Sequence, residues 1–336
     1  TSVQDCTNVQ DCTNVQDCTN VQDCTNVQDC INVQDCTNVQ DCINVQDCIN
    51  EGERCFLEAD LFFGHGTDNA ADEALWLVFY QLDLLWDSDP GVLQLPVSPD
   101  DYLAIQQLFT QRIEKRIPAA YLIGEAWFAG YAFTVDKRVL VPRSPIAELI
   151  HARFQPWLIE QKAPAILDLC TGSGCIGIAS ALQWDHANVT LSDISSDAIE
   201  IARQNIQRHQ LQGRVDLVKS DVFEALSGRC FDLIVSNPPY VDAGDLASMP
   251  AEYHAEPAIG LSSGDDGLDL TRQILAKAAN YLNEQGILIV EVGNSWVNLE
   301  AAFPRVPFIW LEFEQGGHGV LMISRQALLE HQAEFA

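Results

Sequence analysis

Residues 165–182 read AILDLCTGSGCIGIASAL, an apolar run, a glycine-rich turn and a second apolar run. This order predicts a β-strand, a tight turn around Gly172 and Gly174, and a helix. Glycine lets the backbone approach a ligand where a Cβ would clash, and the first amides of the helix point at that ligand. The segment therefore predicts a cofactor-binding turn. By itself it would suit a nicotinamide cofactor as well as any other nucleotide.

Further apolar runs follow this turn, with helical segments between them. They are ANVTLSDI (187–194), RVDLVKSD (214–221), FDLIVSNPPY (231–240), GILIVEVG (286–293) and FIWLEFEQGGHGVLMIS (308–324), the last a closing hairpin. Strands that alternate with helices and end in an antiparallel pair predict an α/β fold, a Rossmann-like doubly wound sheet with its site at the carboxyl ends of the strands. Asp193 ends the second strand about 20 residues after the glycines, where an acid accepts hydrogen bonds from ribose hydroxyls.

The residues before the sheet divide into two parts. Residues 51–122 are predicted to form a helical substrate-recognition domain, because 71–85 and 101–117 carry apolar residues at helical spacing. Ser98 and Asp100 are candidate N-caps of the second helix, and Pro118 ends it. His65 lies in a polar turn and is expected to be structural. Residues 123–145 predict a β-hairpin that turns near Gly130 and a proline-flanked joint, and residues 146–336 form the main domain.

Residues 1–50 are different in kind. The hexad TNVQDC repeats almost perfectly there, with Ile in place of Thr at positions 31, 43 and 49. Such uniformity is typical of a translated tandem repeat and predicts a disordered or incidental extension. A marginal β-solenoid and a thiol-rich metal tract are the alternatives. We expect deletion of residues 1–50 to leave the activity intact.

The composition limits the partners. The formal net charge is -30, which argues against non-specific nucleic-acid binding and permits attraction to a basic protein. Apolar runs are too short to span a membrane, and the first residues do not resemble a secretory signal, so a cytoplasmic protein is expected. Outside the repeat, Cys170, Cys175 and Cys230 lie in apolar segments and predict buried thiols. Cysteine spacing gives no zinc pattern, and no metal is expected.

The motifs together resemble the class I amino-methyltransferases. Those motifs are Asp168, the turn Cys170-Thr171-Gly172-Ser173-Gly174, the pairs Asp193-Ile194 and Asp221-Val222, and Asn237-Pro238-Pro239-Tyr240, in this order. The resemblance implies S-adenosylmethionine as cofactor, with S-adenosylhomocysteine as product. It places the first four groups around the cofactor, with Asp221 beside the adenine amino group, and makes the last group catalytic, with Asn237 also near the cofactor.

Two longer stretches resemble one branch closely. WFAGYAFTVDKRVLVPRSPIAELI (127–150) and DLCTGSGCIGIA (168–179) are similar to the ribosomal protein L-three glutamine methyltransferases, the PrmB branch of the HemK-like enzymes. That branch also carries cysteine where Cys170 replaces a glycine. Glu256 and Pro257 match a family motif. The resemblance runs from about residue 56 to the end, and it implies methylation of a glutamine side chain in ribosomal protein L-three.

The tetrapeptide 237–240 suits an amide substrate. An amide nitrogen is a poor nucleophile because its lone pair is delocalised. The side-chain oxygen of Asn237 and the carbonyl of Pro238 can each accept one amide hydrogen, and so direct the lone pair toward the methyl group. Tyr240 can lie against the planar amide, and the two prolines fix the backbone.

An adenine amino group is planar too, so an adenine methyltransferase acting on nucleic acid is one alternative. A release-factor glutamine methyltransferase is the second, although that branch usually has Pro-Glu where this chain has Ser144-Pro145. A non-catalytic assembly protein is the third. The intact Gly172, Asp193 and Asn237 argue against it.

Overall fold

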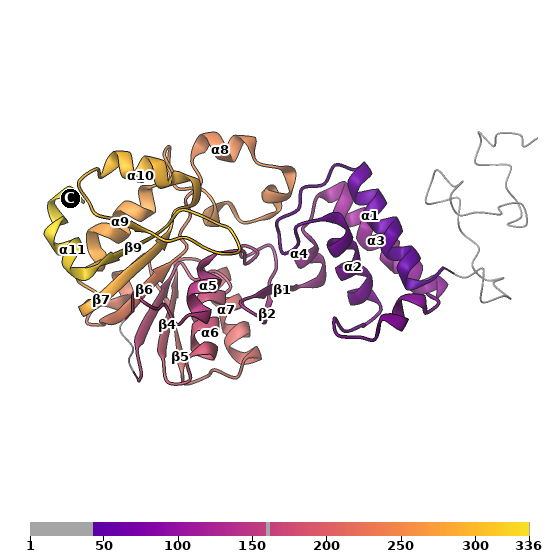
Figure 1. The fold of residues 1–336 in the computed structure, drawn as a ribbon, viewed down its shortest axis with the longest axis horizontal. Helices are drawn as coiled ribbons and strands as arrows, with labels where there is room; N and C mark the ends of the chain where they lie inside the picture. The colour runs from indigo at the N-terminus through magenta and orange to yellow at the C-terminus, as the bar shows by residue number, and fades with distance from the viewer. Residues whose placement is uncertain (1–42, 159–161, 336) are drawn as a thin grey trace, which may run out of the picture.

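The computed structural model describes residues 43–158 and 162–335. Figure 1 shows a helical domain next to a larger domain built on a twisted sheet. The expectations for residues 1–42 of the repeat lie outside the described residues. No helix in the described ranges is both long enough and apolar enough to cross a membrane.

The helical domain packs around one apolar core. Its helices are α1 (Val45–Glu58), α2 (Ala70–Gln81), η5 (Pro90–Gln94), α3 (Pro99–Lys115) and α4 (Ala119–Ile123). The α3 helix begins as the sequence predicts, because Ser98 is the N-cap and accepts a hydrogen bond from the amide of Asp101. Phe56 of α1 and Phe109 of α3 meet edge to face in the core, with ring centroids 5.2 Å apart.

The last repeat unit belongs to this domain, which corrects the boundary expected at residues 50 and 51. Helix α1 starts at Val45, and Asn44 and Asp47 form a capping box at its start. Cys48 is fully buried and Ile49 nearly so. The hexad therefore contains its own helix start signal, and in the last unit the apolar positions face a core that they can join. Deletion of residues 1–50, which we expect to leave the activity intact, would remove these contacts.

The hairpin and joint connect the two domains. Strands β1 (Glu125–Phe128) and β2 (Tyr131–Thr134) pair antiparallel around the predicted turn at Gly130. Asn205 of the sheet domain accepts a hydrogen bond from the amide of Thr134 and donates one to its carbonyl, at 2.7 and 3.0 Å. These bonds attach the hairpin to the sheet domain.

The sheet domain contains the strands that the sequence predicts. Its strands are β3 (Ala165–Leu169), β4 (Asn188–Asp193), β5 (Val215–Lys219), β6 (Phe231–Ser236), β7 (Leu282–Glu291), β8 (Ile309–Trp310) and β9 (Val320–Ser324). They lie side by side in the order β5-β4-β3-β6-β7-β9-β8, and β9 runs antiparallel to both of its neighbours. The chain moves from β3 toward β5 and then returns to β6. The order therefore reverses between β3 and β6, where doubly wound sheets bind ligands.

Helices cover both faces of this sheet. They are α5 (Ile146–His151), α6 (Cys175–Gln183) and α7 (Ser196–Arg208) on one face, and α9 (Asp269–Ala278), α10 (Trp296–Ala302) and α11 (Arg325–Glu330) on the other. Neighbouring strand residues enter opposite cores: Ile166 packs on the first face and Leu167 on the second. The fold class is as the sequence predicts.

Of the three cysteines predicted to be buried, the structure buries one. Cys175 is buried at the start of α6, as expected, whereas Cys170 is half-buried and Cys230 is exposed. Cys230 immediately precedes the first residue of β6, so it lies outside the apolar layer that the strand enters.

We expect the last repeat unit to stabilise the protein. A chain that starts at residue 51 loses the N-cap Asn44 and the buried side chains of Val45, Cys48 and Ile49. Each fully buried aliphatic side chain contributes about 1.5–3 kcal/mol. Thermal unfolding followed by circular dichroism should give a lower midpoint for this chain than for one that starts at residue 43. Equal midpoints would show that α1 contributes no stability before residue 51.

Candidate functional site

The glycine-rich turn follows β3 at the reversal point of the sheet. Gly172 has φ +56°, and a Cβ built on it would meet no atom within 4 Å. The space beside Gly172 is therefore open, as a turn that receives a ligand requires. Cys170, which also has positive φ, precedes it, and Ser173 is buried and bonds Asn205 through its carbonyl. Gly174 caps α6, whose first amides face the same edge.

Asp168 is the buried acid beneath this turn. Its Oδ2 accepts hydrogen bonds from the Thr171 hydroxyl at 2.5 Å and from the Gly177 amide at 2.8 Å. Its Oδ1 is buried and has no hydrogen-bond partner in the described part of the chain. Burial raises the pKa of Asp168 to about 7 against the opposing effect of these two donors. A buried carboxylate oxygen without a donor is expensive, and it marks a place where a ligand donor would be stabilising.

Asp193 ends β4 where the sequence predicts. Its carboxylate accepts from the amides of Gly172 and Ser195, both at 2.9 Å, and so links the glycine turn to the next strand. Burial raises the pKa of Asp193 despite these amides. Ile194 follows with its side chain 48% exposed, a large apolar side chain beside the turn.

Asp221, the third predicted acid, is exposed, whereas Asp168 is buried. Asp221 follows β5, and the next residue, Val222, is buried with φ +46°. The β5 end reaches the same edge, because the amide of Ser220 donates to the carbonyl of Asp193. The structure thus brings the predicted cofactor residues other than Asn237 to the carboxyl ends of β3, β4 and β5.

The tetrapeptide Asn237-Pro238-Pro239-Tyr240 leaves the end of β6, next to β3. The Ser236 hydroxyl donates to the carbonyl of Leu169 at 2.7 Å, which ties the two strand ends together. Asn237 is half-buried, and its carboxamide makes no hydrogen bond to any residue that the structure describes. Its donor and acceptor groups are therefore available for a bound molecule.

Tyr240 is held in place from β7, by residues that the sequence reasoning missed. Its hydroxyl donates to Glu291 at 3.0 Å, and its carbonyl accepts from the Ser295 hydroxyl at 2.7 Å. Glu291 also accepts a hydrogen bond from Ser144 of the joint at 2.5 Å. The sequence could have indicated Glu291, because this acid ends a predicted strand, at the same edge of the sheet as Asp168 and Asp193.

The segment after Tyr240 forms a closed loop, residues 241–263, that includes α8 (Ala243–Ser248), η7 (Ala251–Ala255) and η8 (Ala258–Gly260). Its two ends are joined, because Val241 donates to the carbonyl of Leu261 and accepts from the amide of Ser263. A change in the conformation of this loop would therefore reach Tyr240 directly.

Glu256 anchors the loop to the joint. It receives two hydrogen bonds from the Arg143 guanidinium, at 2.7 and 2.6 Å, and one from the amide of Val141 at 2.9 Å. Burial alone would raise the pKa of Glu256, but Arg143 outweighs it and lowers the pKa to about 2. His65 is 1% exposed, with its Nε2 3.7 Å from Glu256, and it lies against the Tyr253 ring. Neither ring nitrogen of His65 has a hydrogen-bond partner among the described residues, and its structural role stays a prediction.

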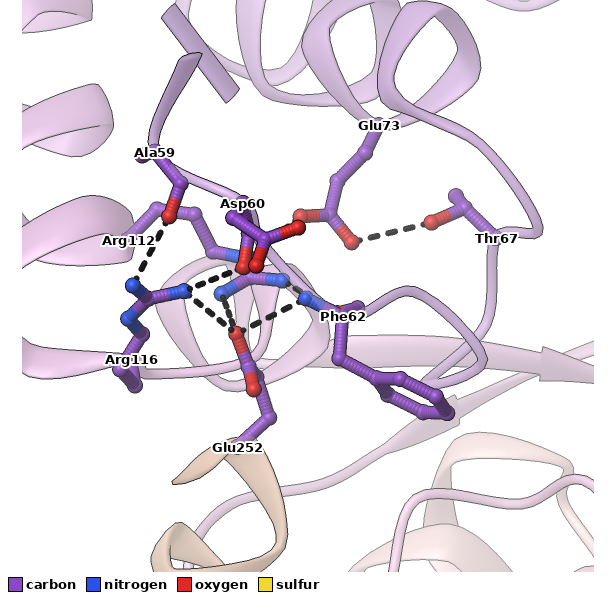
Figure 2. A network of polar contacts seen from close by, with 8 residues as sticks. All are labelled: Ala59, Asp60, Phe62, Thr67, Glu73, Arg112, Arg116 and Glu252. Carbon is purple, nitrogen blue, oxygen red and sulfur yellow. Dashed lines mark hydrogen bonds and ion pairs between the residues drawn. The ribbon is translucent and has the colours of Figure 1, made fainter. Parts of the chain in front are cut away.

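Glu252 anchors the same loop to the helical domain. Figure 2 shows its carboxylate between Arg112 and Arg116 of the helical domain, beside the chain at Phe62. Its Oε1 accepts from Arg112 at 3.2 Å, from Arg116 at 3.4 Å and from the Phe62 amide at 3.1 Å. Arg112 is itself buried and also pairs with Glu73 at 2.5 Å. The loop that follows the tetrapeptide is thus bonded to both the helical domain and the joint.

The described residues contain no cluster of side chains suited to bind a metal ion. Among residues 43–158 and 162–335, no group of three or more His, Cys, Asp or Glu side chains could hold a metal ion.

Several known proteins are similar to this chain. The family model "Methyltransferase small domain" matches residues 154–252. A protein of Francisella tularensis subsp. tularensis named "Ribosomal protein uL3 glutamine methyltransferase" is 47% identical over 82% of this chain and 88% of its own length. A protein of the same name from Xanthomonas campestris pv. campestris is 48% identical over 84% and 91%. A solved methyltransferase from Pyrococcus furiosus is 20% identical, covers 66% of this chain and 98% of its own, and has a TM-score of 0.43.

We expect the Glu252 contacts to stabilise the whole protein. Glu252→Gln removes one of two buried acids that balance Arg112 and Arg116, and an uncompensated buried charge costs about 3–5 kcal/mol. Denaturant unfolding should show a loss near the lower end of this range, because the glutamine oxygen still accepts hydrogen bonds. Glu114→Gln, at an exposed position of α3, is the matched control. Equal effects of the two changes would mean that the buried ion pairs contribute nothing.

The pKa of Asp168 predicts a pH dependence of stability in the absence of ligand. Its folded pKa of about 7 lies above the ordinary value of 3.8, so the folded state holds a proton that the unfolded state has lost. The free energy of unfolding should therefore fall as pH rises from about 4 to about 7, by up to about 1.4 kcal/mol per pH unit.

Asp168→Asn should remove this slope, whereas Asp185→Asn, at an exposed position, should keep it. Denaturant unfolding at a series of pH values measures both. A wild-type slope that persists in Asp168→Asn would assign the effect to other groups.

Proposed function

Because this chain belongs to the family of ribosomal protein uL3 glutamine methyltransferases, we propose that it transfers a methyl group from S-adenosylmethionine to a glutamine side chain of ribosomal protein uL3. The identity of 47–48% over more than four fifths of the chain carries this proposal. The reaction is S-adenosylmethionine-dependent protein methylation on the side-chain amide nitrogen. We propose that it acts in the cytoplasm, because the substrate in the names of its relatives is a ribosomal protein.

The edge formed by β3, β4 and β5 suits S-adenosylmethionine. The open space at Gly172 and the unpartnered Oδ1 of Asp168 leave room and hydrogen-bonding capacity for a ligand. We assign the ribose hydroxyls to Asp193 and one face of the adenine to Ile194. The turn Cys170–Gly174 would hold the amino-acid part, and Asp221 and Val222 would border the adenine amino group. When bound, the cofactor supplies a methyl carbon that is already electrophilic because it is attached to a sulfonium.

The tetrapeptide then orients the glutamine amide. The free Asn237 carboxamide oxygen would accept one amide hydrogen and the Pro238 carbonyl the other, which directs the nitrogen lone pair toward the methyl carbon. Pro239 keeps this stretch of backbone rigid, and Tyr240 would lie against the amide plane. The nitrogen–carbon bond forms as the sulfur–carbon bond breaks. The amide proton then becomes acidic enough to leave to solvent, so no strong base is required.

The charge distribution suits a basic protein partner. The chain carries 48 Asp and Glu against 18 Lys and Arg. Several basic side chains of the helical domain are engaged internally, since Arg112 and Arg116 bond Glu252, and Arg54 pairs with Glu58. Ribosomal proteins carry basic surfaces because they bind RNA phosphates. We propose that the acidic helical domain receives uL3 before it meets RNA.

The proposal is tested by incubating purified uL3 with the enzyme and S-adenosylmethionine and mapping peptides by mass spectrometry. We expect one methyl group on one glutamine. Asn237→Ala should lower kcat by about 10²–10³-fold, the usual loss when one preorganised group at the reacting centre is removed. Asn280→Ala, an exposed asparagine at the opposite end of the sheet, should retain full activity.

Other outcomes would reassign the substrate. Methylation of release factors but not of uL3 would identify the sister family, and methylation of adenine in nucleic acid without any protein product would favour a base methyltransferase. No transfer to any of the three would point to an assembly protein.

A further inference from the structure

A buried acid, Glu291, stands at the carboxyl end of β7 and is not explained by cofactor or amide binding as proposed above. It is 5% exposed, and within the described residues it forms no ion pair. Burial raises its pKa, against the effect of its two hydroxyl partners and the nearby Arg143 charge. A carboxyl group held in such a place without a charged partner destabilises the fold, which makes a purely structural role costly. Its hydrogen bonds indicate what it does instead.

Glu291 receives two hydroxyl hydrogens, one on each oxygen. The Ser144 hydroxyl donates to Oε2 at 2.5 Å, and the Tyr240 hydroxyl donates to Oε1 at 3.0 Å. A carboxylate with two bound donors fixes the direction of both O–H bonds. The hydrogen of Tyr240 is therefore committed to Glu291, and the lone pairs of the phenol oxygen point elsewhere.

The rest of Tyr240 is held by the residues that follow Glu291. A Cβ built on Gly293 would lie 2.5 Å from Cε2 of the Tyr240 ring, so only glycine allows the ring to lie this close to the chain. The Ser295 hydroxyl holds the Tyr240 carbonyl. The hydroxyl of Tyr240 is thus set by Glu291 at the end of β7, and its ring and carbonyl are set by Gly293 and Ser295 just after that strand.

Ser144 brings the joint into this arrangement. Its oxygen donates to Glu291 and accepts from the amide of Ile146 at the start of α5, at 3.2 Å. The neighbouring residue, Arg143, bonds Glu256 of the loop that follows Tyr240. Consecutive residues of the joint therefore bond the loop that follows Tyr240 and the acid that receives the Tyr240 hydroxyl hydrogen.

We propose that Glu291 is a positioning residue that orients Tyr240 against the substrate amide, and that Ser144 fixes the Glu291 carboxylate for this purpose. The inference rests on the proposed function. Glu291 does not touch the substrate and acts only through Tyr240. Replacement by glutamine keeps the size but leaves one acceptor oxygen for two hydroxyl donors, so the Tyr240 ring is no longer fixed.

The test is a double-mutant cycle measured with uL3 and S-adenosylmethionine. We expect Glu291→Gln and Tyr240→Phe each to lower kcat about 10-fold, with KM for uL3 and the Kd for S-adenosylmethionine within about twofold of wild type. The double variant should be no slower than Tyr240→Phe alone, because Glu291 has no other route to the reaction. Glu284→Gln, an exposed glutamate earlier on β7, is the matched control and should behave as wild type.

Three results would overturn the inference: unchanged kcat in Glu291→Gln, multiplicative losses near 100-fold in the double variant, or a loss that falls on S-adenosylmethionine affinity. If Glu291→Gln does not fold, Ser144→Ala combined with Tyr240→Phe gives an equivalent cycle in which each single variant removes one hydroxyl. There too, multiplicative losses, or no loss in Ser144→Ala, would count against the inference. Failure of wild-type enzyme and Glu284→Gln to methylate uL3 would instead overturn the proposed function.

Discussion

The arrangement of the two domains depends on one buried carboxylate. Glu252 lies in the loop that follows the tetrapeptide 237–240, yet its partners Arg112, Arg116 and Phe62 belong to the helical domain. With Glu73 the cluster holds two acids and two arginines, so its charges balance. Removing such charges from water costs several kcal/mol per ion unless every one is paired. The helical domain and the loop are therefore stable in this geometry and expensive to separate, which specifies one position of the loop.

A second constraint acts at the carboxyl edge of the sheet. Asp168, Asp193 and Glu291 each end a strand there, and burial raises the pKa of all three. Perturbed acids of this kind gather at functional sites because a fold would not otherwise retain them. The three acids differ in their hydrogen-bond partners. Asp193 is bonded by two backbone amides and Glu291 by two hydroxyls, whereas Asp168 has one oxygen with no partner. The incomplete member lies under the turn that we assign to the cofactor.

The sequence predicted those parts of the fold and of the candidate site that depend on residues close together in the chain. Gly172, Gly174 and Asp193 stand in a strand, turn and helix pattern that can be recognised within about 30 residues. The doubly wound sheet was predicted from the alternation of strands with helices along the chain. The ion pairs of Glu252 and the contact between Ser144 and Glu291 join residues 140 and 147 positions apart, and no periodicity reveals such pairs. The start of α1 was missed for another reason. Its capping signal, Asn44 and Asp47, recurs in every repeat unit after the first, which has Ser2 in place of the asparagine, so the sequence could not show which unit is followed by a core.

The division between local and distant contacts also bears on specificity. A tetrapeptide at the end of β6 can present two acceptors to any planar amino group, whether it belongs to an amide or to a base. What distinguishes substrates must then lie in the groups that set the approach to it. In this chain these are the joint, through Ser144 and Arg143, and the loop 241–263, through Glu252 and Glu256. The loop is bonded to the helical domain and to the joint, and the joint is bonded in addition to Glu291 of β7. A shared chemistry at the strand ends can therefore serve different substrates when the helical domain and the joint change, while the sheet stays the same.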